Sequence, residues 1–141
     1  MRTAARGGGL RYGAGAAAAE FATVAATFLL VFFGLIETAL AVYDYNAVCT
    51  AAREAVRYAI VHSPASANPA TTVQIQQVAE GYAASLDPTK LTVTVSWPAD
   101  ANLPAQKDAE VQVAYLYQMR IPFFSSVSMS LTSTSRMLVS Q

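Results

Sequence analysis

The sequence has a single cysteine, Cys49, and a single histidine, His62. One cysteine excludes an intramolecular disulfide, and together the two residues are too few ligands for a metal site of usual composition. No nucleophile elbow, phosphate loop or dinucleotide fingerprint is present, and any catalytic triad would have to use His62. We therefore predict that the protein is not an enzyme, with no cofactor and no small-molecule substrate. Cys49 is interpreted as a small apolar residue of a helix.

Charged residues are also scarce, at 13% of the chain against about 25% in an average soluble domain. The formal net charge is zero, which argues against nucleic acid as a partner because phosphate binding needs a basic patch. The charges are unevenly placed, since Arg2, Arg6 and Arg11 all precede the first acid, Glu20. Under the positive-inside rule, this predicts a cytoplasmic N-terminus and an extracytoplasmic position for the residues after about 42.

A long apolar run follows Glu20. It has no charge from Phe21 to Ile36 and continues past Glu37 to Val42. These roughly 22 residues would span about 33 Å as a helix, enough to cross a hydrocarbon core of about 30 Å. Glu37 is predicted to lie near the outer interface. A carboxylate at the threshold of such a helix is costly, so Glu20 is the main candidate for a functional residue.

Three interpretations of residues 1–42 are open. The segment is an uncleaved signal anchor, a signal peptide cut after Ala39-Leu40-Ala41, or a helix whose leader is removed after Gly15. The acids Glu20 and Glu37 argue against the signal peptide, because they flank or interrupt the apolar core.

The residues around Gly15 resemble a known processing site. Gly15, four alanines (Ala16 to Ala19), Glu20 and Phe21 are similar to the cleavage site of type IV prepilins. The stretches 43–47 (YDYNA) and 51–59 (AAREAVRYA) resemble the TadE-like proteins of the tight-adherence (Tad/Flp) pilus system. This resemblance implies a leader at 1–15 removed by a prepilin peptidase, a transmembrane helix at 16–42 and an external α+β domain at 43–141. Related sequences often have a proline inside the membrane helix, and its lack here implies a straight helix.

The resemblance also implies a function, that of a minor pseudopilin in pilus assembly and cell adhesion. Its expected location is the bacterial inner membrane, and its partners are other pilin-like subunits and the Tad assembly machinery. Glu20 would pair with a positive group such as the new terminal amine of a neighbouring subunit, and Ala22, Ala25 and Ala26 would let helices pack closely. Whether the protein enters the filament or stays in the membrane is open.

Two alternatives remain. One is a membrane-anchored or secreted extracytoplasmic binding domain. The other is a pseudopilin of a type II secretion system, which Ala16 disfavours because that class usually begins with phenylalanine after cleavage.

The apolar pattern continues beyond the membrane segment as one helix. No proline or glycine occurs between Gly34 and His62, and apolar residues recur at steps of three and four: Val48, Ala52, Ala55, Val56, Ala59 and Ile60. A single helix over about 17–61 is therefore predicted. Arg53, Glu54 and Arg57 fall on the other side, with Glu54 and Arg57 close enough to pair. They form either a solvated face or a docking strip for a neighbouring subunit.

The rest of the chain predicts a small α+β domain. Thr71 and Thr72 are expected to cap a helix over 73–85, with Ile75, Val78, Ala79 and Tyr82 facing inward. Alternation then predicts strands at 91–97, 111–118 and 127–139, which would form an antiparallel sheet packed on the long helix, as in a pilin-like fold. Two interpretations of the segment Ile121-Pro122-Phe123-Phe124 are open. It exposes an aromatic side chain, which would contact the membrane surface or a groove of a partner, or it forms a turn whose aromatic side chains cover the end of the sheet.

Overall fold

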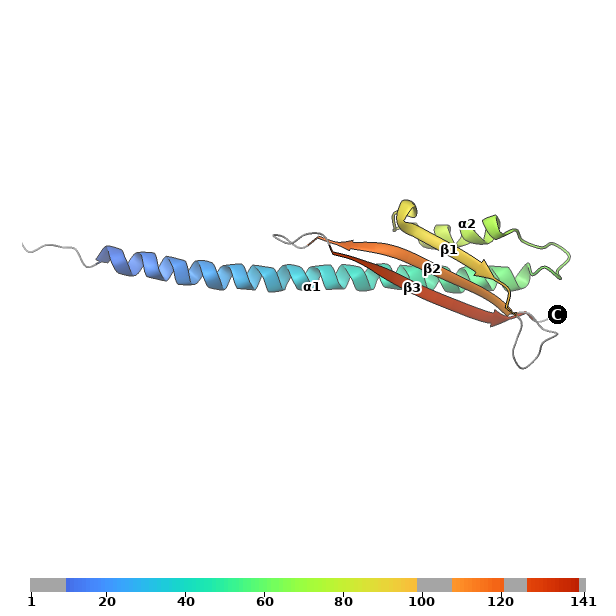
Figure 1. Ribbon diagram of the computed structural model, residues 1–141, viewed down its shortest axis with the longest axis horizontal. Coiled ribbons are helices and arrows are strands. Elements are labelled where there is room, and N and C mark those ends of the chain that lie inside the picture. The colour runs from blue at the N-terminus through green and yellow to red at the C-terminus, as the bar shows by residue number, and fades with distance from the viewer. Residues whose placement is uncertain (1–9, 99–107, 121–126, 140–141) are drawn as a thin grey trace, which may run out of the picture.

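The computed structural model describes residues 10–98, 108–120 and 127–139, and it has the predicted α+β architecture (Figure 1). The elements in chain order are helix α1 (Leu10–Val61), helix α2 (Thr72–Tyr82), a 3-10 turn η1 (Pro88–Lys90), and strands β1 (Leu91–Ser96), β2 (Asp108–Met119) and β3 (Val127–Leu138). The segment 121–124 and the first nine residues of the predicted leader lie outside the described residues.

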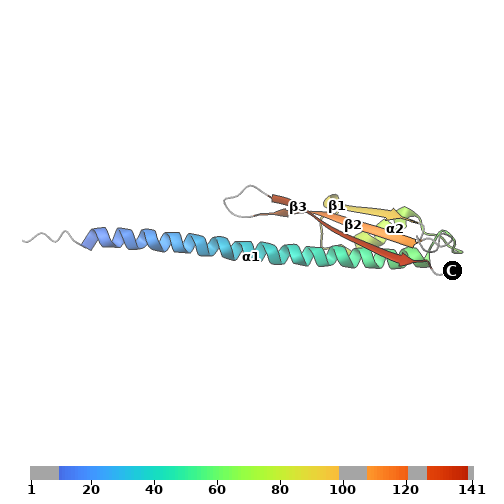
Figure 2. The same cartoon turned by 60° about the horizontal axis from the view of Figure 1, so that its bottom comes forward.

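Helix α1 has 52 residues, which corresponds to a length of about 78 Å. Its N-terminal half projects beyond the sheet, while its C-terminal half carries the other elements (Figures 1 and 2). Hydroxyl groups in the apolar half are satisfied within the helix: Thr23 donates to the carbonyl of Ala19 at 3.0 Å, and Thr38 donates to that of Gly34 at 2.8 Å. The helix is straight in both views, as the lack of an internal proline predicts.

The sheet is antiparallel with the strand order β1-β2-β3. Val93 of β1 lies opposite Val113 of β2, and Tyr117 of β2 lies opposite Met129 of β3. The predicted three strands in sequence order are therefore confirmed. Strand β2 occupies the centre and runs toward the N-terminal half of α1. The end of the sheet at which β2 finishes and β3 begins, the hairpin end, therefore points toward the part of the helix before Glu37, residues 13–36, which we call its bare half.

The core lies between the C-terminal half of α1, the inner face of β2 and helix α2. Five of the six residues of the predicted α1 stripe are fully buried, and Ile60 is half-buried. Four alanines of α1 are fully buried: Ala51, Ala52, Ala55 and Ala59. Such small side chains let α2 and the sheet approach the helix closely, so the bulk of the core comes from the facing elements: Ile75, Val111, Val113, Tyr115 and Tyr117.

Helix α2 begins as predicted and ends earlier than predicted. Thr71 is its N-cap, and Thr71 and Gln74 form a reciprocal capping box. Ile75 and Ala79 are buried and Val78 is half-buried, but the inward position expected for Tyr82 is wrong, because its side chain is 54% exposed. The helix ends at Tyr82 rather than at residue 85, and buried Ala83 takes the inward position where the chain turns away.

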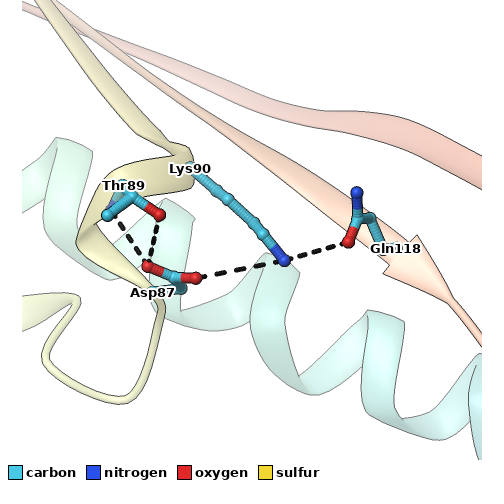
Figure 3. Close-up of polar contacts among 4 residues, drawn as sticks. All are labelled: Asp87, Thr89, Lys90 and Gln118. Carbon is cyan, nitrogen blue, oxygen red and sulfur yellow. Dashed lines mark hydrogen bonds and ion pairs between the residues drawn. The ribbon is translucent and has the colours of Figure 1, made fainter.

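The turn η1 ties the start of β1 to the end of β2 (Figure 3). Asp87 accepts hydrogen bonds from the backbone and side chain of Thr89, at 3.0 and 2.7 Å, and these bonds lower the pKa of the carboxyl. The ammonium of Lys90 lies 4.0 Å from Asp87 and donates to the side-chain oxygen of Gln118 at 3.1 Å. A cation is thereby held at the same end of the sheet as the β2–β3 hairpin.

Candidate processing and assembly site

The predicted processing site lies on the bare part of α1. The helix passes through Gly15, Ala16, Glu20 and Phe21 without a break, and all four residues are exposed. A Cβ atom added at Gly15 would meet nothing within 4 Å, and the same is true at Gly13. Glycine in a helix interior costs about 1 kcal/mol relative to alanine. Packing within this chain therefore gives no reason for a glycine at position 15.

Glu20 faces outward and no described side chain forms an ion pair or hydrogen bond with it. Of the small residues predicted to support helix packing, Ala22 and Ala26 are exposed and Ala25 is half-buried. None of the three belongs to the core of the described residues or packs against it. Within the part of the chain that the structure describes, the carboxylate therefore has no partner.

The bare half of α1 is apolar around its whole circumference. Its most apolar stretch of 18 residues is only 6% buried, which distinguishes it from the core helix of a soluble protein. Its exposed large side chains are Phe21, Val24, Phe28, Leu29, Leu30, Val31, Phe32, Phe33, Leu35 and Ile36. By length and composition it is long and apolar enough to cross a membrane.

The sheet contacts α1 at Glu37, and Ala41 is the first buried residue within residues 13–61 of this helix. The hydroxyl of Tyr117 donates to the Glu37 carboxylate at 2.8 Å and lies 3.3 Å from the Glu37 carbonyl oxygen. Ala41 is 6% exposed. Burial, followed by the hydrogen bond and charge of Glu37, raises the pKa of Tyr117 to about 12. The sequence predicted that Glu37 lies near the outer membrane interface but contained no signal for this contact, since the two residues are 80 positions apart.

The candidate docking strip lies near the far end of α1. Arg53 and Arg57 are exposed and Glu54 is half-buried. No ion pair joins Glu54 to Arg57; the ion pairs among the described residues are Lys90–Asp87 and Arg136–Asp108. Glu54 and Arg57 border a shallow cavity of about 250 Å³ that Tyr58, Val61, His62, Val78 and Tyr82 also line.

His62 has a structural role at the end of the helix. Its ring stacks on Tyr58 with 4.2 Å between centroids, and its Nδ1 lies 3.2 Å from the Tyr58 carbonyl oxygen. Cys49 is half-buried on α1. Within residues 10–98, 108–120 and 127–139, no three histidine, cysteine or acidic side chains gather in a way that could hold a metal ion.

The long helix with a bare apolar half and the small antiparallel sheet on its other half define an α+β protein built on a single long helix. Residues 15–57 match the family model described as TadE-like protein, so this segment of the chain is TadE-like, and the resemblance found in the sequence is confirmed there. The match begins at Gly15 and ends at Arg57, covering the bare half of α1 and most of its packed half. No curated protein and no solved structure matches the chain.

Proposed function

We propose that the protein is a minor pseudopilin that acts in the assembly of a tight-adherence pilus, after a prepilin peptidase removes residues 1–15. One observation carries this proposal: an outward-facing carboxylate, Glu20, lies on the bare apolar half of α1, five residues after a glycine that packing does not require. The TadE-like match, which starts at Gly15, supports the same placement. The role is structural rather than enzymatic.

The proposed location is the bacterial inner membrane, crossed once by residues 16–42. The three arginines before Glu20 favour a cytoplasmic N-terminus, with residues 43–141 outside. A cut after Ala41 would separate Glu37 and Ala41 from the domain. Because Tyr117 bonds to Glu37 and Ala41 is buried, these contacts favour a helix that stays attached to the domain.

In assembly, the bare helices of neighbouring subunits would pack side by side. Cleavage after Gly15 creates a positive amine on Ala16, one turn from Glu20. With little water between the helices, the Glu20 carboxylate favours a register that brings a neighbour's amine within reach. Ala22, Ala25 and Ala26 allow the close approach that this contact needs.

Intact mass of the protein extracted from membranes tests the processing step. The expected mass is that of residues 16–141, with or without a small N-terminal modification. A bulky residue in Gly15→Phe is expected to block cleavage. The matched control is Gly13→Phe, because Gly13 lies in the same helix with the same open surroundings. Both variants change the helix alike, so only peptidase recognition separates them.

A full-length mass, or one that lacks residues 1–41, would contradict the proposal. Either result would favour the alternative of a membrane-anchored or secreted binding domain. Equal processing of Gly13→Phe and Gly15→Phe would also contradict it, since the glycine would then have no role in recognition.

A further inference from the structure

The hairpin end of the sheet extends beyond the contact between Tyr117 and Glu37, in the direction of the N-terminus of α1. Tyr117, which bonds to Glu37, lies opposite Met129, and the ladder continues to the pair Met119 and Val127. This end points toward the bare half of α1 in both views (Figures 1 and 2). The sheet therefore lies alongside the last part of the apolar helix, whose large side chains stay exposed.

The overlap can be measured along the chain. A strand rises about 3.4 Å per residue, so Met119 and Val127 lie about 7 Å beyond Tyr117. The same distance along α1 corresponds to about five residues before Glu37, near Phe32. Phe32 is 48% exposed and lies inside the uncharged run. If the uncharged run lies in a bilayer, the hairpin end reaches the depth of the outer membrane interface.

The side chains at this end suit such a position. Val127 and Met129 are 55% and 41% exposed, although they share a face with Leu131, which is buried. The opposite face of β3 is polar and carries Ser128, Ser130 and Thr132. The exposed apolar residues are thus on the side that faces α1, beyond the part of the sheet that α1 and α2 cover.

Basic groups accompany these apolar side chains. Arg120 follows Met119 and is exposed, and Lys90 is held nearby by Gln118 (Figure 3). The acid beside Lys90 is Asp87, and Glu37 is bonded to Tyr117. Apolar side chains next to long basic ones are typical of protein segments at the boundary between headgroups and acyl chains, where the cation reaches back to lipid phosphate.

We propose that the hairpin end, defined as Met119, Arg120, Val127 and Met129, is seated in the extracytoplasmic interface of the membrane that α1 crosses. Val127 and Met129 contact the upper acyl chains, and Arg120 contacts lipid phosphate. This inference rests on the proposed membrane anchor. It gives the external domain a second membrane contact and a fixed tilt, and a subunit that leaves the membrane for a filament has to release that contact.

The test is the accessibility of spin labels on the full chain, one copy per lipid nanodisc, in a Cys49→Ala background. Labels are placed at Val127→Cys, at Phe28→Cys in the bare helix, and at Met137→Cys, which is the control on the same face of β3. Met137 is 36% exposed and lies ten residues from Val127, or about 34 Å along the strand. Collisions with dissolved oxygen report hydrocarbon, and collisions with a nickel chelate report water.

The oxygen-to-nickel collision ratio of the label at Val127 is expected to lie several-fold above that at Met137 and below that at Phe28, because Phe28 lies deeper along α1 than the hairpin end. A label at Met129→Cys provides an independent repeat if the Val127 label disturbs the strand. Water-like behaviour at Val127 and Met129, with hydrocarbon-like behaviour at Phe28, would overturn the inference and leave the anchor intact. Water-like behaviour at Phe28 would overturn the anchor itself. Shielding of Val127 from both reagents would mean that protein covers the hairpin end, which also overturns the inference.

Discussion

The Tyr117 hydroxyl donates a hydrogen bond of 2.8 Å to the Glu37 carboxylate, which joins the end of β2 to the helix at the first acid after the uncharged run. Tyr117 is 7% exposed. The contact fixes the position along α1 at which the domain begins. It therefore determines the length of apolar helix that precedes the sheet. This is the length available to cross a membrane or to pack in the core of a filament.

Tyr117→Phe should destabilise the domain by about 1.5–3 kcal/mol, because a hydrogen bond to a charged group is lost and the carboxylate is left beside an apolar ring. Urea unfolding of the full chain in detergent, followed by the fluorescence of the single tryptophan Trp97, would measure the loss. Tyr115→Phe is the matched control: its ring is similarly buried, at 8% exposure, and its hydroxyl has no hydrogen bond to a described residue. Equal losses in the two variants would contradict the role given to Glu37.

The same contact should make stability depend on pH in the alkaline range. The folded protein raises the pKa of Tyr117 from 10.0 to about 12, so the folded state favours the protonated hydroxyl. The resulting stabilisation is fully present below pH 10 and is lost as the pH rises from 10 to 12. The difference in unfolding free energy between wild type and Tyr117→Phe should therefore be constant from pH 7 to 9 and shrink above pH 10. A difference that grows above pH 10 would show that the sign is wrong.

The ion pair between Arg136 and Asp108 should matter more than that between Lys90 and Asp87. The Asp108 side chain is 6% exposed and accepts a hydrogen bond from Arg136 Nε, whereas Asp87 and Lys90 are 45% and 29% exposed. Arg136→Met leaves a buried carboxylate without its cation and should cost about 1.5–3 kcal/mol. Lys90→Met is the exposed counterpart and should cost less, because water screens that pair. Similar unfolding midpoints for the two variants would contradict this ranking.

Sequence periodicity predicted which faces are buried wherever other elements cover the whole length of the pattern. The steps of three and four in residues 48–60 identified the core face of α1, because the sheet and α2 cover that stripe and leave only Ile60 half-buried. Alternation worked equally well for Val111, Val113 and Tyr115, because β2 has a neighbour on both sides and α1 beneath it. These predictions needed no knowledge of distant contacts.

Periodicity failed where the alternating or helical pattern continues beyond the element that packs against it. Val127 and Met129 alternate like core residues but are exposed, because β3 extends beyond the covered part of the sheet. Tyr82 fits the inner face of α2 but stands at its last residue. The Tyr117–Glu37 hydrogen bond could not be predicted either. Alternation indicates which face of the sheet a residue occupies, but the position of the sheet along the helix follows only from the assembled fold.

Glu20→Ala should leave processing intact and prevent assembly. The carboxylate has no partner among the described side chains, so its loss should not change the folded domain, and Gly15 is untouched. In a dry helix bundle, however, the variant leaves a neighbour's amine without a counter-charge, which costs several kcal/mol per contact. Intact mass would verify cleavage, and the amount of the subunit in sheared pili, relative to that in membranes, would measure assembly.

Thr23→Ala is the control for this experiment. Thr23 is exposed one turn further along α1, but its hydroxyl already bonds to the Ala19 carbonyl at 3.0 Å, so its removal leaves no neighbour unpaired. It should assemble like wild type. Glu20→Gln should behave like Glu20→Ala, because it keeps the size of the side chain and removes only the charge. Normal amounts of correctly cleaved Glu20→Ala in pili would show that this carboxylate is not needed to hold subunits in register.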